Sequence, residues 1–417
     1  MSSKYEVVQV EDRGQRRAFM DFIWKLHKND PNWVPPIRMN QEELVNFRRH
    51  PFYENAKCRT FILRKDGEVA GRIAAIINNG HNKRFGEKRG FFGFFDCIDD
   101  QQAANLLFME ACRYLKSEGM NDVRGPCNPS LNYEIGALVD GFDTPPTFMM
   151  TYNWPYYDKL IQGFGFEKTQ DLFAYEGNLE MLKTIDPKLK FVIDEVKRRF
   201  NVTLRPANRK KFGEEVKLFL KIYNESLQGT WGFVPLSDAE CVGLGASLKL
   251  LIDPSLTSFV EVDGKTVAVG LCLPDYNPLI KKINGRLFPF GFLTMLFGRR
   301  KIKKVRVMST NVVPEYQRWG LGLVVLDRML PDCLALGINE AEFSWVLESN
   351  HLSRGSLERA VQLVRKRIAF MIERSAIFSR SRLPGGTATE FLTGRQDLQP
   401  ADDCPTGAIF AGLCYIA

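Results

Sequence analysis

The sequence predicts a mixed α/β protein built from two similar halves, each with a twisted mixed sheet flanked by helices. Both halves contain a pair of strand-like runs joined by an Asp-Gly turn, at Asp66-Gly67 and at Asp263-Gly264. In both, a long helical run ends at a glycine, followed by Met-Asn-Asp-Val after Gly119 and by Ile-Asn-Glu-Ala after Gly337. Asp-Gly between alternating apolar runs is a strong hairpin signal, and matched blocks in the same order indicate an internal duplication.

In the first half, the elements follow from apolar spacing. Phe19, Phe22, Ile23 and Leu26 recur at helical intervals, whereas residues 5–10 alternate as in a strand. The expected elements are a strand at 5–10, a helix at 13–27, hairpin strands at 60–64 and 69–77, an apolar strand at 90–95 and a helix at 100–117.

The second half repeats this order. Its expected elements are a basic helix at 187–200, a helix at 214–226, hairpin strands at 259–262 and 266–273, a strand at 305–309, a helix from 323 that ends at Gly337, and a strand at 342–347. We place the first domain at residues 1–180 and the second at 181–359.

Composition points to an ordinary globular protein. The chain has 417 residues, 45% of them apolar, and a formal net charge of +8, which does not require a nucleic acid partner. Its nine cysteines form no C-x-x-C pair, so we expect a reducing, cytoplasmic environment and no metal site. No stretch reaches the roughly 18 apolar residues of a spanning helix, so no transmembrane segment is expected.

A glycine-bearing loop, residues 312–322, lies between the strand at 305–309 and the helix from 323. Such a strand, loop and helix aim unpaired backbone N–H groups and the positive end of the helix dipole at one point, which suits a pyrophosphate. Gly320 and Gly322 allow close approach to the backbone. A dinucleotide fingerprint is disfavoured, because Val325 stands where its third glycine would be.

The pattern Gln317-x-x-Gly320-x-Gly322, preceded by Val312-x-Pro314, resembles the acetyl-CoA signature of the GNAT superfamily of N-acyltransferases. The resemblance implies that acetyl-CoA is the co-substrate. The implied cofactor-binding residues are Val312, Val313, Gln317, Arg318, Trp319, Gly320, Leu321 and Gly322. At the matching place the first half has Asp96, Asp99 and Asp100, whose charges would repel a pyrophosphate, so we interpret it as a degenerate copy.

The whole chain is similar to bacterial tandem GNAT-like proteins, through segments such as 51–55, 90–95, 141–146, 230–236, 284–290 and 344–348. This implies an N-acetyltransferase that acts on an unknown primary amine of a small molecule or peptide. Two alternatives stay open: a Fem-type aminoacyl transferase that uses charged tRNA, against which the CoA loop argues, and a non-catalytic CoA sensor or scaffold.

Candidate catalytic and acceptor residues follow from the same resemblance. Glu348 ends an apolar strand and is assigned as general base, directly or through a water that Asn350 orients; the alternative is a solvated strand end. Trp231 and Phe233 are candidates to pack on the acceptor, or else core aromatics.

Two neighbouring segments have several interpretations. Six cations within 299–306 form either a solvated face or a site for the phosphate on the CoA ribose. The apolar stretch 287–297 is a buried lid or a linker by default, and otherwise a seat for an acyl chain or a contact with an anionic membrane.

The tail departs from the resemblance after Arg359. The family would continue with a Gly-Gly turn and a last strand that ends in a tyrosine. One codon choice for residues 360–373, read one base earlier, yields Gly-Gly-Ala-Ile-Gly-Thr-Gln-Thr-His-Arg-Ile-Tyr-Asp, which resembles that ending. We therefore hypothesise that 360–417 is an irregular tail that arises from a frameshift, with a helix at 360–380 and without the last strand.

Overall fold

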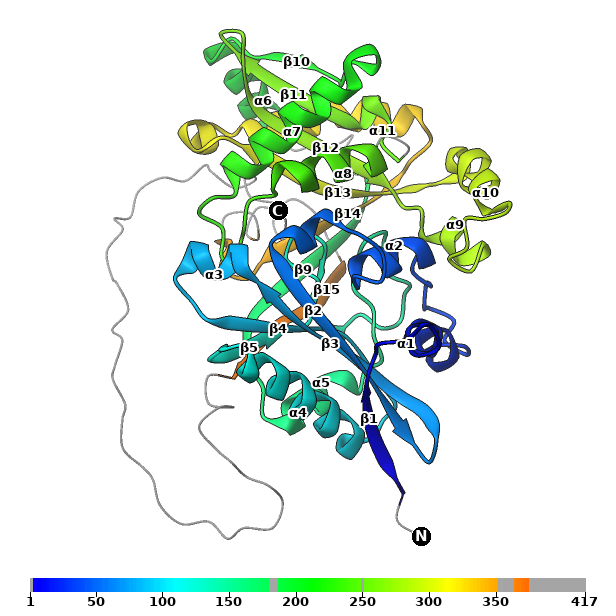
Figure 1. Ribbon diagram of the computed structural model, residues 1–417. Helices are drawn as coiled ribbons and strands as arrows, with labels where there is room; N and C mark the ends of the chain where they lie inside the picture. The colour runs from blue at the N-terminus through cyan, green and yellow to red at the C-terminus, as the bar shows by residue number, and fades with distance from the viewer. Residues whose placement is uncertain are drawn as a thin grey trace.

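A computed structural model of the chain describes residues 3–179, 187–248, 251–351, 354, 357 and 364–374. One 13-stranded sheet runs through the whole molecule, with the first half of the chain at one end and the second half at the other (Figure 1). Its path, in spatial order, is β1 (Tyr5–Gln9), β2 (Ala56–Lys65), β3 (Glu68–Asn78), β4 (Arg89–Cys97), β5 (Asp122–Gly125), β15 (Val364–Arg374), β9 (Glu167–Asn178), β14 (Glu340–Leu347), β13 (Lys304–Val312), β12 (Lys265–Pro274), β11 (Thr257–Val262) and β10 (Thr203–Arg205). β8 (Ala137–Asp140) also pairs with β15, and β6 (Cys127–Asn128) and β7 (Glu134–Ile135) form a separate small sheet.

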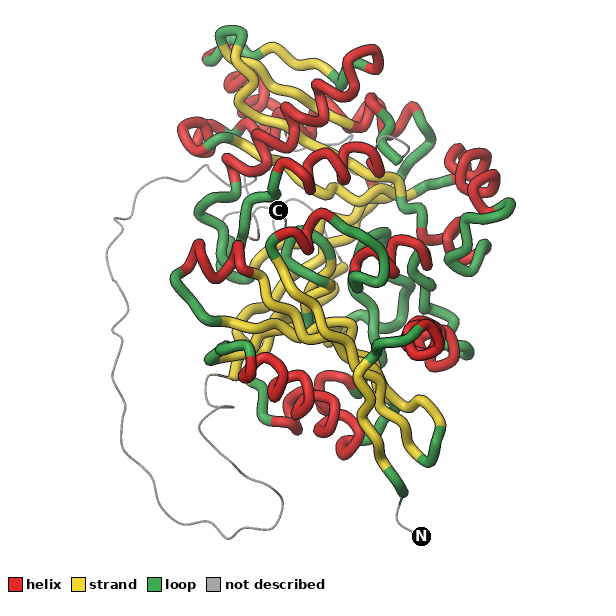
Figure 2. Tube along the Cα trace, viewed as in Figure 1, coloured by secondary structure: helices red, strands yellow, loops and turns green. Residues whose placement is uncertain are grey.

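The helices lie on both faces of this sheet (Figure 2). The first half contributes α1 (Arg13–Leu26), α2 (Arg38–Leu44), α3 (Asn79–Phe85), α4 (Gln101–Ser117) and α5 (Tyr157–Phe164). The second contributes α6 (Pro187–Arg199), α7 (Phe212–Ser226), α8 (Asp238–Leu248), α9 (Asn277–Lys282), α10 (Gly291–Gly298) and α11 (Leu321–Ala335). Short 3₁₀ turns are η1 (Pro51–Glu54), η3 (Arg209–Lys211), η4 (Pro254–Leu256), η5 (Arg299–Lys301) and η6 (Pro314–Trp319).

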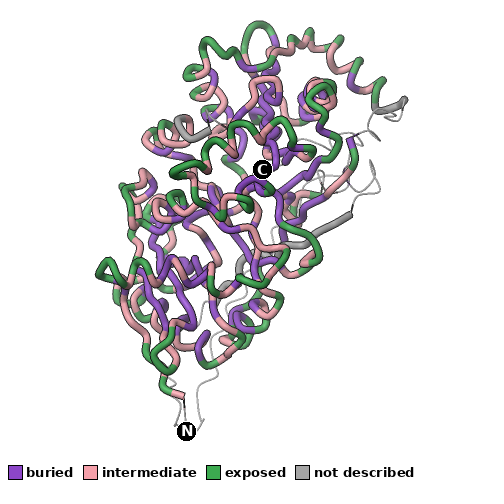
Figure 3. Tube along the Cα trace, turned by 90° about the vertical axis from the view of Figure 1, so that its right-hand side faces the viewer, coloured by how far each residue is buried: buried purple, intermediate pink, exposed green. Residues whose placement is uncertain are grey.

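Alternation along β3 shows how the first half is layered. Ile73 and Ala75 pack in the cluster that contains α4, whereas Ala74 and Ile76 pack in the cluster that contains α1. Successive side chains of a strand point to opposite faces, so α4 and α1 cover opposite sides of the sheet. The central strands are buried and most exposed positions lie on the surrounding helices and loops (Figure 3).

The strand order confirms the duplication. Read from either end, the sheet begins with an outer strand, a hairpin pair and a parallel pair: β1, β2/β3 and β4/β5 at one end, β10, β11/β12 and β13/β14 at the other. The Asp-Gly hairpins predicted at residues 66–67 and 263–264 join β2 to β3 and β11 to β12. The mixed α/β fold in two tandem copies is therefore as predicted.

The two halves exchange their last strands. β9 follows the first half along the chain but pairs with β14 of the second, and β15 follows the second half but pairs with β5 of the first. β9 and β15 also pair with each other at the centre. Each parallel pair is thus extended by a strand from the other half of the chain. The domain limits 1–180 and 181–359 remain a prediction.

β15 corrects the expectation for the tail. Residues 364–374 form a strand, so the helix expected within 360–380 and the loss of the last strand are both wrong for this stretch. The strand pairs along β9 on one edge and with β5 and β8 on the other, and these non-local hydrogen bonds outweigh local helical spacing. The rest of the frameshift hypothesis, residues 375–417, lies outside the described residues.

Candidate active site between β13 and β14

The glycine loop has the predicted strand, turn and helix arrangement. β13 ends at Val312, η6 turns the chain, and α11 begins at Leu321. Gly320 has φ of 75°, in the left-handed region that glycine adopts without a steric penalty. The amide Nε2 of Gln317 donates to the carbonyl oxygens of Ser226 at 3.2 Å and Val312 at 3.1 Å. The Gln317 side chain therefore fixes the shape of the loop.

Aromatic packing holds the rest of the loop. Trp319 stacks on Phe200 with a centroid separation of 3.8 Å, and Tyr316 meets Trp319 edge-on at 4.5 Å. Arg318 is exposed, and Leu321 and Gly322 are buried at the start of the 15-residue helix α11. The first N–H groups of such a helix, with its dipole, favour an anion.

Cations gather on this side through α6, whose last turn carries Lys197, Arg198 and Arg199. Val196 of the same helix lies 3.6 Å from the position that a Cβ on Gly320 would occupy. The basic end of α6 thus lies beside the loop and Arg318, with Lys197 paired to Asp327 at 2.6 Å and Arg198 to Glu195 at 2.6 Å, so that part of its charge is compensated.

Next to the loop, β13 has an edge without a neighbouring strand among the described elements. It pairs with β12 as far as Val312, but its parallel pairing with β14 covers only Lys304 to Val307. On its other edge β14 pairs with β9 from Glu340 to Leu347, whereas its pairing with β13 stops at Phe343, so β13 and β14 diverge beyond that residue. Within the described residues, the edge of β13 from Met308 to Val312 has no strand beside it and could pair with an extended ligand.

Unsatisfied polar atoms mark the same stretch of β13. Thr310 and Asn311 are 1% and 2% exposed, yet Thr310 Oγ1 and Asn311 Oδ1 lack a hydrogen-bond partner in the part of the chain that the structure describes. Asn311 Nδ2 donates to Ser226 Oγ at 2.9 Å. Buried polar atoms are normally paired. Thr310 and Asn311 are successive residues of β13 and point to opposite faces of the sheet, so a polar ligand along this edge could meet at most one of the two unpaired atoms.

A buried charge network, which the sequence analysis missed, lies at the point of divergence. Arg306 Nε donates to Ser344 Oγ at 2.9 Å, and Ser344 Oγ donates to Glu342 Oε1 at 2.7 Å. Thr147 Oγ1 donates to Glu342 Oε2 at 2.5 Å. Burial lowers the pKa of Arg306 to about 10. The signal was present in the sequence as polar residues at alternate positions of otherwise apolar strands.

The network corrects the interpretation of the basic run at 299–306. Arg306 is 3% exposed, and Lys304 Nζ donates to Glu176 at 2.8 Å, so neither belongs to a solvated face. The rest of the run precedes β13, whereas the glycine loop follows it. At about 3.3 Å per residue, the nine residues of β13 separate the two by about 30 Å. The run is therefore poorly placed for a phosphate of a CoA held at the loop.

Glu348 and Asn350 follow β14, as expected. The Glu348 carboxylate accepts from the backbone N–H of Asp171 on β9 at 3.2 Å, and its own N–H donates to the carbonyl of Asp171 at 2.9 Å. Asn350 N–H donates to the carbonyl of Leu347 at 2.9 Å. Glu348 is thus fastened to the exchanged strand β9, and its role as general base stays a prediction.

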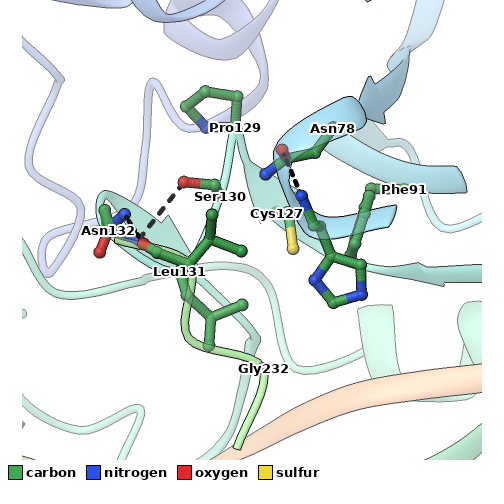
Figure 4. Close-up of a pocket in the computed structure, with 10 residues that line it drawn as sticks. Asn78, Phe91, Cys127, Pro129, Ser130, Leu131, Asn132 and Gly232 are labelled. Carbon is green, nitrogen blue, oxygen red and sulfur yellow. Dashed lines mark hydrogen bonds between the residues drawn. The ribbon is translucent and has the colours of Figure 1, made fainter. Parts of the chain in front are cut away.

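Trp231 and Phe233 lie where the second half meets the first. Phe233 is 3% exposed and packs edge-on against Tyr223 at 5.6 Å, so it serves the core. The Arg124 guanidinium lies 4.7 Å over the Trp231 ring. A small pocket opens next to them, with Gly232 facing Asn78 and the segment 129–132 of the first half (Figure 4). Contact of Trp231 or Phe233 with an acceptor remains a prediction.

In the first half, the corresponding divergence between β4 and β5 is filled. β4 pairs with β5 only from Arg89 to Phe91 although it continues to Cys97. Asn128 Oδ1 accepts from the Phe94 N–H at 2.6 Å, and a Cβ on Gly93 would lie 1.7 Å from the Cys127 carbonyl oxygen. A segment of the chain itself therefore occupies the place that a ligand would take.

The helix start in the first half is closed as well. The Asp100 carboxylate caps α4 by accepting from the N–H groups of Gln102 at 3.0 Å and Ala103 at 3.1 Å, and it pairs with Lys65 at 2.6 Å. An acidic side chain thus satisfies the N–H groups that would meet a phosphate. This geometry supports the interpretation of the first half as a degenerate copy.

Glu134 leads to a pH-dependent prediction. Burial, and then the nearby Asp96 carboxylate, raise its pKa from an ordinary 4.5 to about 7. Between these values the unfolded chain loses a proton that the folded chain keeps, so this group's contribution to stability falls as the pH rises. We expect Glu134→Gln to stabilise the protein relative to the wild type more at pH 8 than at pH 5, measured by urea unfolding. Glu6→Gln, at an exposed site, should show no such trend, and an equal effect of Glu134→Gln at both pH values would contradict the assignment.

The sequence of the chain is similar to those of two known proteins. No model of a known protein family matches the chain. It is 35% identical over 354 residues to protein YghO of Escherichia coli (strain K12), which covers 84% of this chain and 90% of that protein. It is 33% identical over 360 residues to the bacterial ceramide synthase of Caulobacter vibrioides, which covers 82% and 91%.

Solved structures show the same fold. A tandem GNAT protein from the clavulanic acid biosynthesis pathway aligns with 89% of this chain and 98% of its own, with a TM-score of 0.52 and 10% identity. A GCN5-related glucosamine N-acetyltransferase region of a fungal multi-domain β-N-acetylglucosaminidase aligns with 89% of this chain and 38% of its own, with a TM-score of 0.50 and 12% identity. These neighbours show that the chain has the tandem GNAT fold. More narrowly, the chain belongs to the family that includes protein YghO and the bacterial ceramide synthase.

Proposed function

We propose that the protein transfers an acyl group from an acyl-CoA to a primary amine at the divergence of β13 and β14. The observation that supports this proposal most directly is that the edge of β13 continues into the glycine loop, whose N–H groups favour an anion. The edge of β13 from Met308 to Val312, which has no described strand beside it, runs directly into the loop that is shaped by Gly320. A ligand with a pyrophosphate at one end and an amide-bearing arm at the other fits both features at once, which favours CoA.

Each part of the site has a proposed role in the reaction. Backbone N–H groups from Gln317 to Gly322 hold the pyrophosphate, with Arg318 and the basic end of α6 nearby. The edge of β13 aligns the pantetheine arm and polarises the thioester carbonyl. The amine nitrogen attacks that carbonyl carbon and the C–S bond breaks. The amine proton passes to a base, for which Glu348 is our candidate, and the CoA thiolate leaves and takes up a proton.

The acceptor that we favour is a long-chain amino alcohol. One of the two curated relatives is named a bacterial ceramide synthase, at 33% identity over 360 residues. A ceramide is the amide of a fatty acid with a sphingoid base, so its synthesis is an acyl transfer to a primary amine. We propose the same class of acceptor for this chain, with acetyl-CoA or a longer acyl-CoA as the acyl donor.

A thiol-release assay tests this proposal. Purified protein is given acetyl-CoA or a long-chain acyl-CoA, with sphinganine, a polyamine or a peptide with a free amine as acceptor. We expect amine-dependent thiol release with sphinganine and a matching amide product by mass spectrometry. CoA binding with no release for any donor and acceptor pair would instead support the sensor interpretation, and release with the polyamine or peptide alone would refute the lipid acceptor.

A further inference from the structure

Residues 277–303, here called the α9–α10 protrusion, expose large apolar side chains to solvent. In the described part of the chain twelve large apolar side chains are exposed, and six of them lie within residues 288–297. They are Phe288 (71% exposed), Phe290 (73%), Phe292 (45%), Leu293 (37%), Leu296 (57%) and Phe297 (72%). α10 projects from the side of the molecule, away from the sheet (Figure 1). The expectation of a buried lid is therefore wrong for these side chains.

The protrusion is held firmly at its base. Leu279, Ile280 and Ile302 are buried in a core cluster below it. A Cβ on Gly298 would lie 2.6 Å from the Leu279 side chain, so α10 already packs closely on α9. The exposed rings on α10 cannot turn inward without displacing this packing.

Contacts with the first half hold the loop before α10. The Gly285 carbonyl accepts from Arg38 N–H at 3.0 Å, and Trp24 Nε1 donates to Asn284 Oδ1 at 3.1 Å. A Cβ on Gly285 would lie 2.2 Å from the Pro36 carbonyl oxygen. The apolar surface is thus displayed by a braced element.

Cations surround this apolar surface. Residues 276–314 contain no Asp or Glu, and six basic residues of the protrusion are exposed: Lys281, Lys282, Arg286, Arg300, Lys301 and Lys303. Arg299 pairs with Asp253 at 2.8 Å and so fastens the end of α10 to the body of the protein. Apolar side chains with a rim of cations match the surface of a bilayer with anionic headgroups.

We propose that the α9–α10 protrusion docks the protein on an anionic phospholipid bilayer, with the phenylalanine and leucine side chains at the acyl boundary and the cations on lipid phosphates. A second copy of the chain fits this surface poorly, because a two-fold interface would oppose cations to cations. No helix within the described residues is long and apolar enough to cross a membrane, so the contact is with the bilayer surface. The protrusion lies at the Lys304 end of β13 and the glycine loop at its other end, so CoA could bind at the loop while the protrusion contacts lipid.

Vesicle flotation of the full chain tests the proposal. We expect the wild type to float with vesicles of phosphatidylglycerol and phosphatidylethanolamine at low salt, and to bind at least tenfold less to phosphatidylcholine or at high salt. Phe290→Ser with Phe297→Ser should abolish flotation, and Lys282→Glu with Arg300→Glu and Lys301→Glu should reduce binding to anionic vesicles at least tenfold. Circular dichroism melting checks that each variant is folded.

A matched control removes exposed apolar side chains elsewhere. Phe191 and Leu336 are 68% and 44% exposed and lie outside the protrusion, so Phe191→Ser with Leu336→Ser should float as the wild type does. Three results would overturn the proposal. They are a wild type that stays with the soluble fraction, a Phe290 and Phe297 double variant that floats normally, and a dimer in analytical ultracentrifugation that this double variant converts to monomer.

Discussion

Gly320→Val is expected to abolish measurable binding of CoA. Gly320 has φ of 75°, a conformation that a β-branched residue adopts only under strain. The strain costs about 1–3 kcal/mol or moves the loop, and each charged hydrogen bond lost from a displaced N–H costs about 1.5–3 kcal/mol. Together these effects weaken binding by about 100-fold or more. Isothermal titration calorimetry with CoA measures this directly.

Gly264→Val is the matched control for this substitution. Gly264 has φ of 76°, lies in the hairpin between β11 and β12, and has no atom within 4 Å of an added Cβ. The same backbone strain is thus introduced away from the loop, and CoA affinity should stay within about twofold of the wild type, a change of about 0.4 kcal/mol. If Gly320→Val bound CoA as tightly as Gly264→Val does, the glycine loop would not be the CoA site.

Local sequence signals predicted the parts of the fold whose geometry is itself local. The Asp-Gly turns at 66–67 and 263–264 require positive φ at two adjacent residues, and both hairpins are present. Gly320 likewise marked a left-handed turn between a strand and a helix. In each case a local backbone conformation requires a particular residue type, so a single sequence is enough to predict that conformation.

The strand exchange could not be read from the sequence in this way. Nothing local in β9 or β15 states which half of the sheet each strand joins. Their partners are fixed by pairing across the molecule, between residues as distant as Glu176 and Val364. The same limit explains why a helix was expected where β15 forms.

The strand, loop and helix of the candidate site were predicted, but the buried network around Arg306 and Glu342 was not. Arg306 was grouped with exposed cations because its neighbours at 299–303 are basic, yet its position on β13 turns it into the core. The apolar run 287–297 was expected to be buried, because composition alone does not show whether a helix has anything to pack against. Charge and hydrophobicity along the chain therefore identified both segments but not their surroundings.

Glu342→Ala is expected to destabilise the protein by about 3–5 kcal/mol, the usual cost of leaving a buried charge without its partner. Glu342 is 1% exposed and accepts from Thr147 Oγ1 and Ser344 Oγ, while Arg306 and Lys304 supply the nearest positive charges. Burial already lowers the pKa of Arg306, and Glu342 is the group that most favours its charged form. The midpoint of urea unfolding, followed by circular dichroism, should shift accordingly.

Two further variants separate charge from packing in this network. Glu342→Gln keeps an acceptor for Thr147 and Ser344 but loses the charge, so its effect should lie between those of the wild type and Glu342→Ala. Arg306→Met combined with Glu342→Leu removes both charges and fills their space, and should recover most of the loss, because two buried charges that neutralise each other contribute little beyond their mutual compensation. A double variant as unstable as Glu342→Ala would show that the hydrogen bonds of the network, and not its charge balance, hold β13 and β14 together where they diverge.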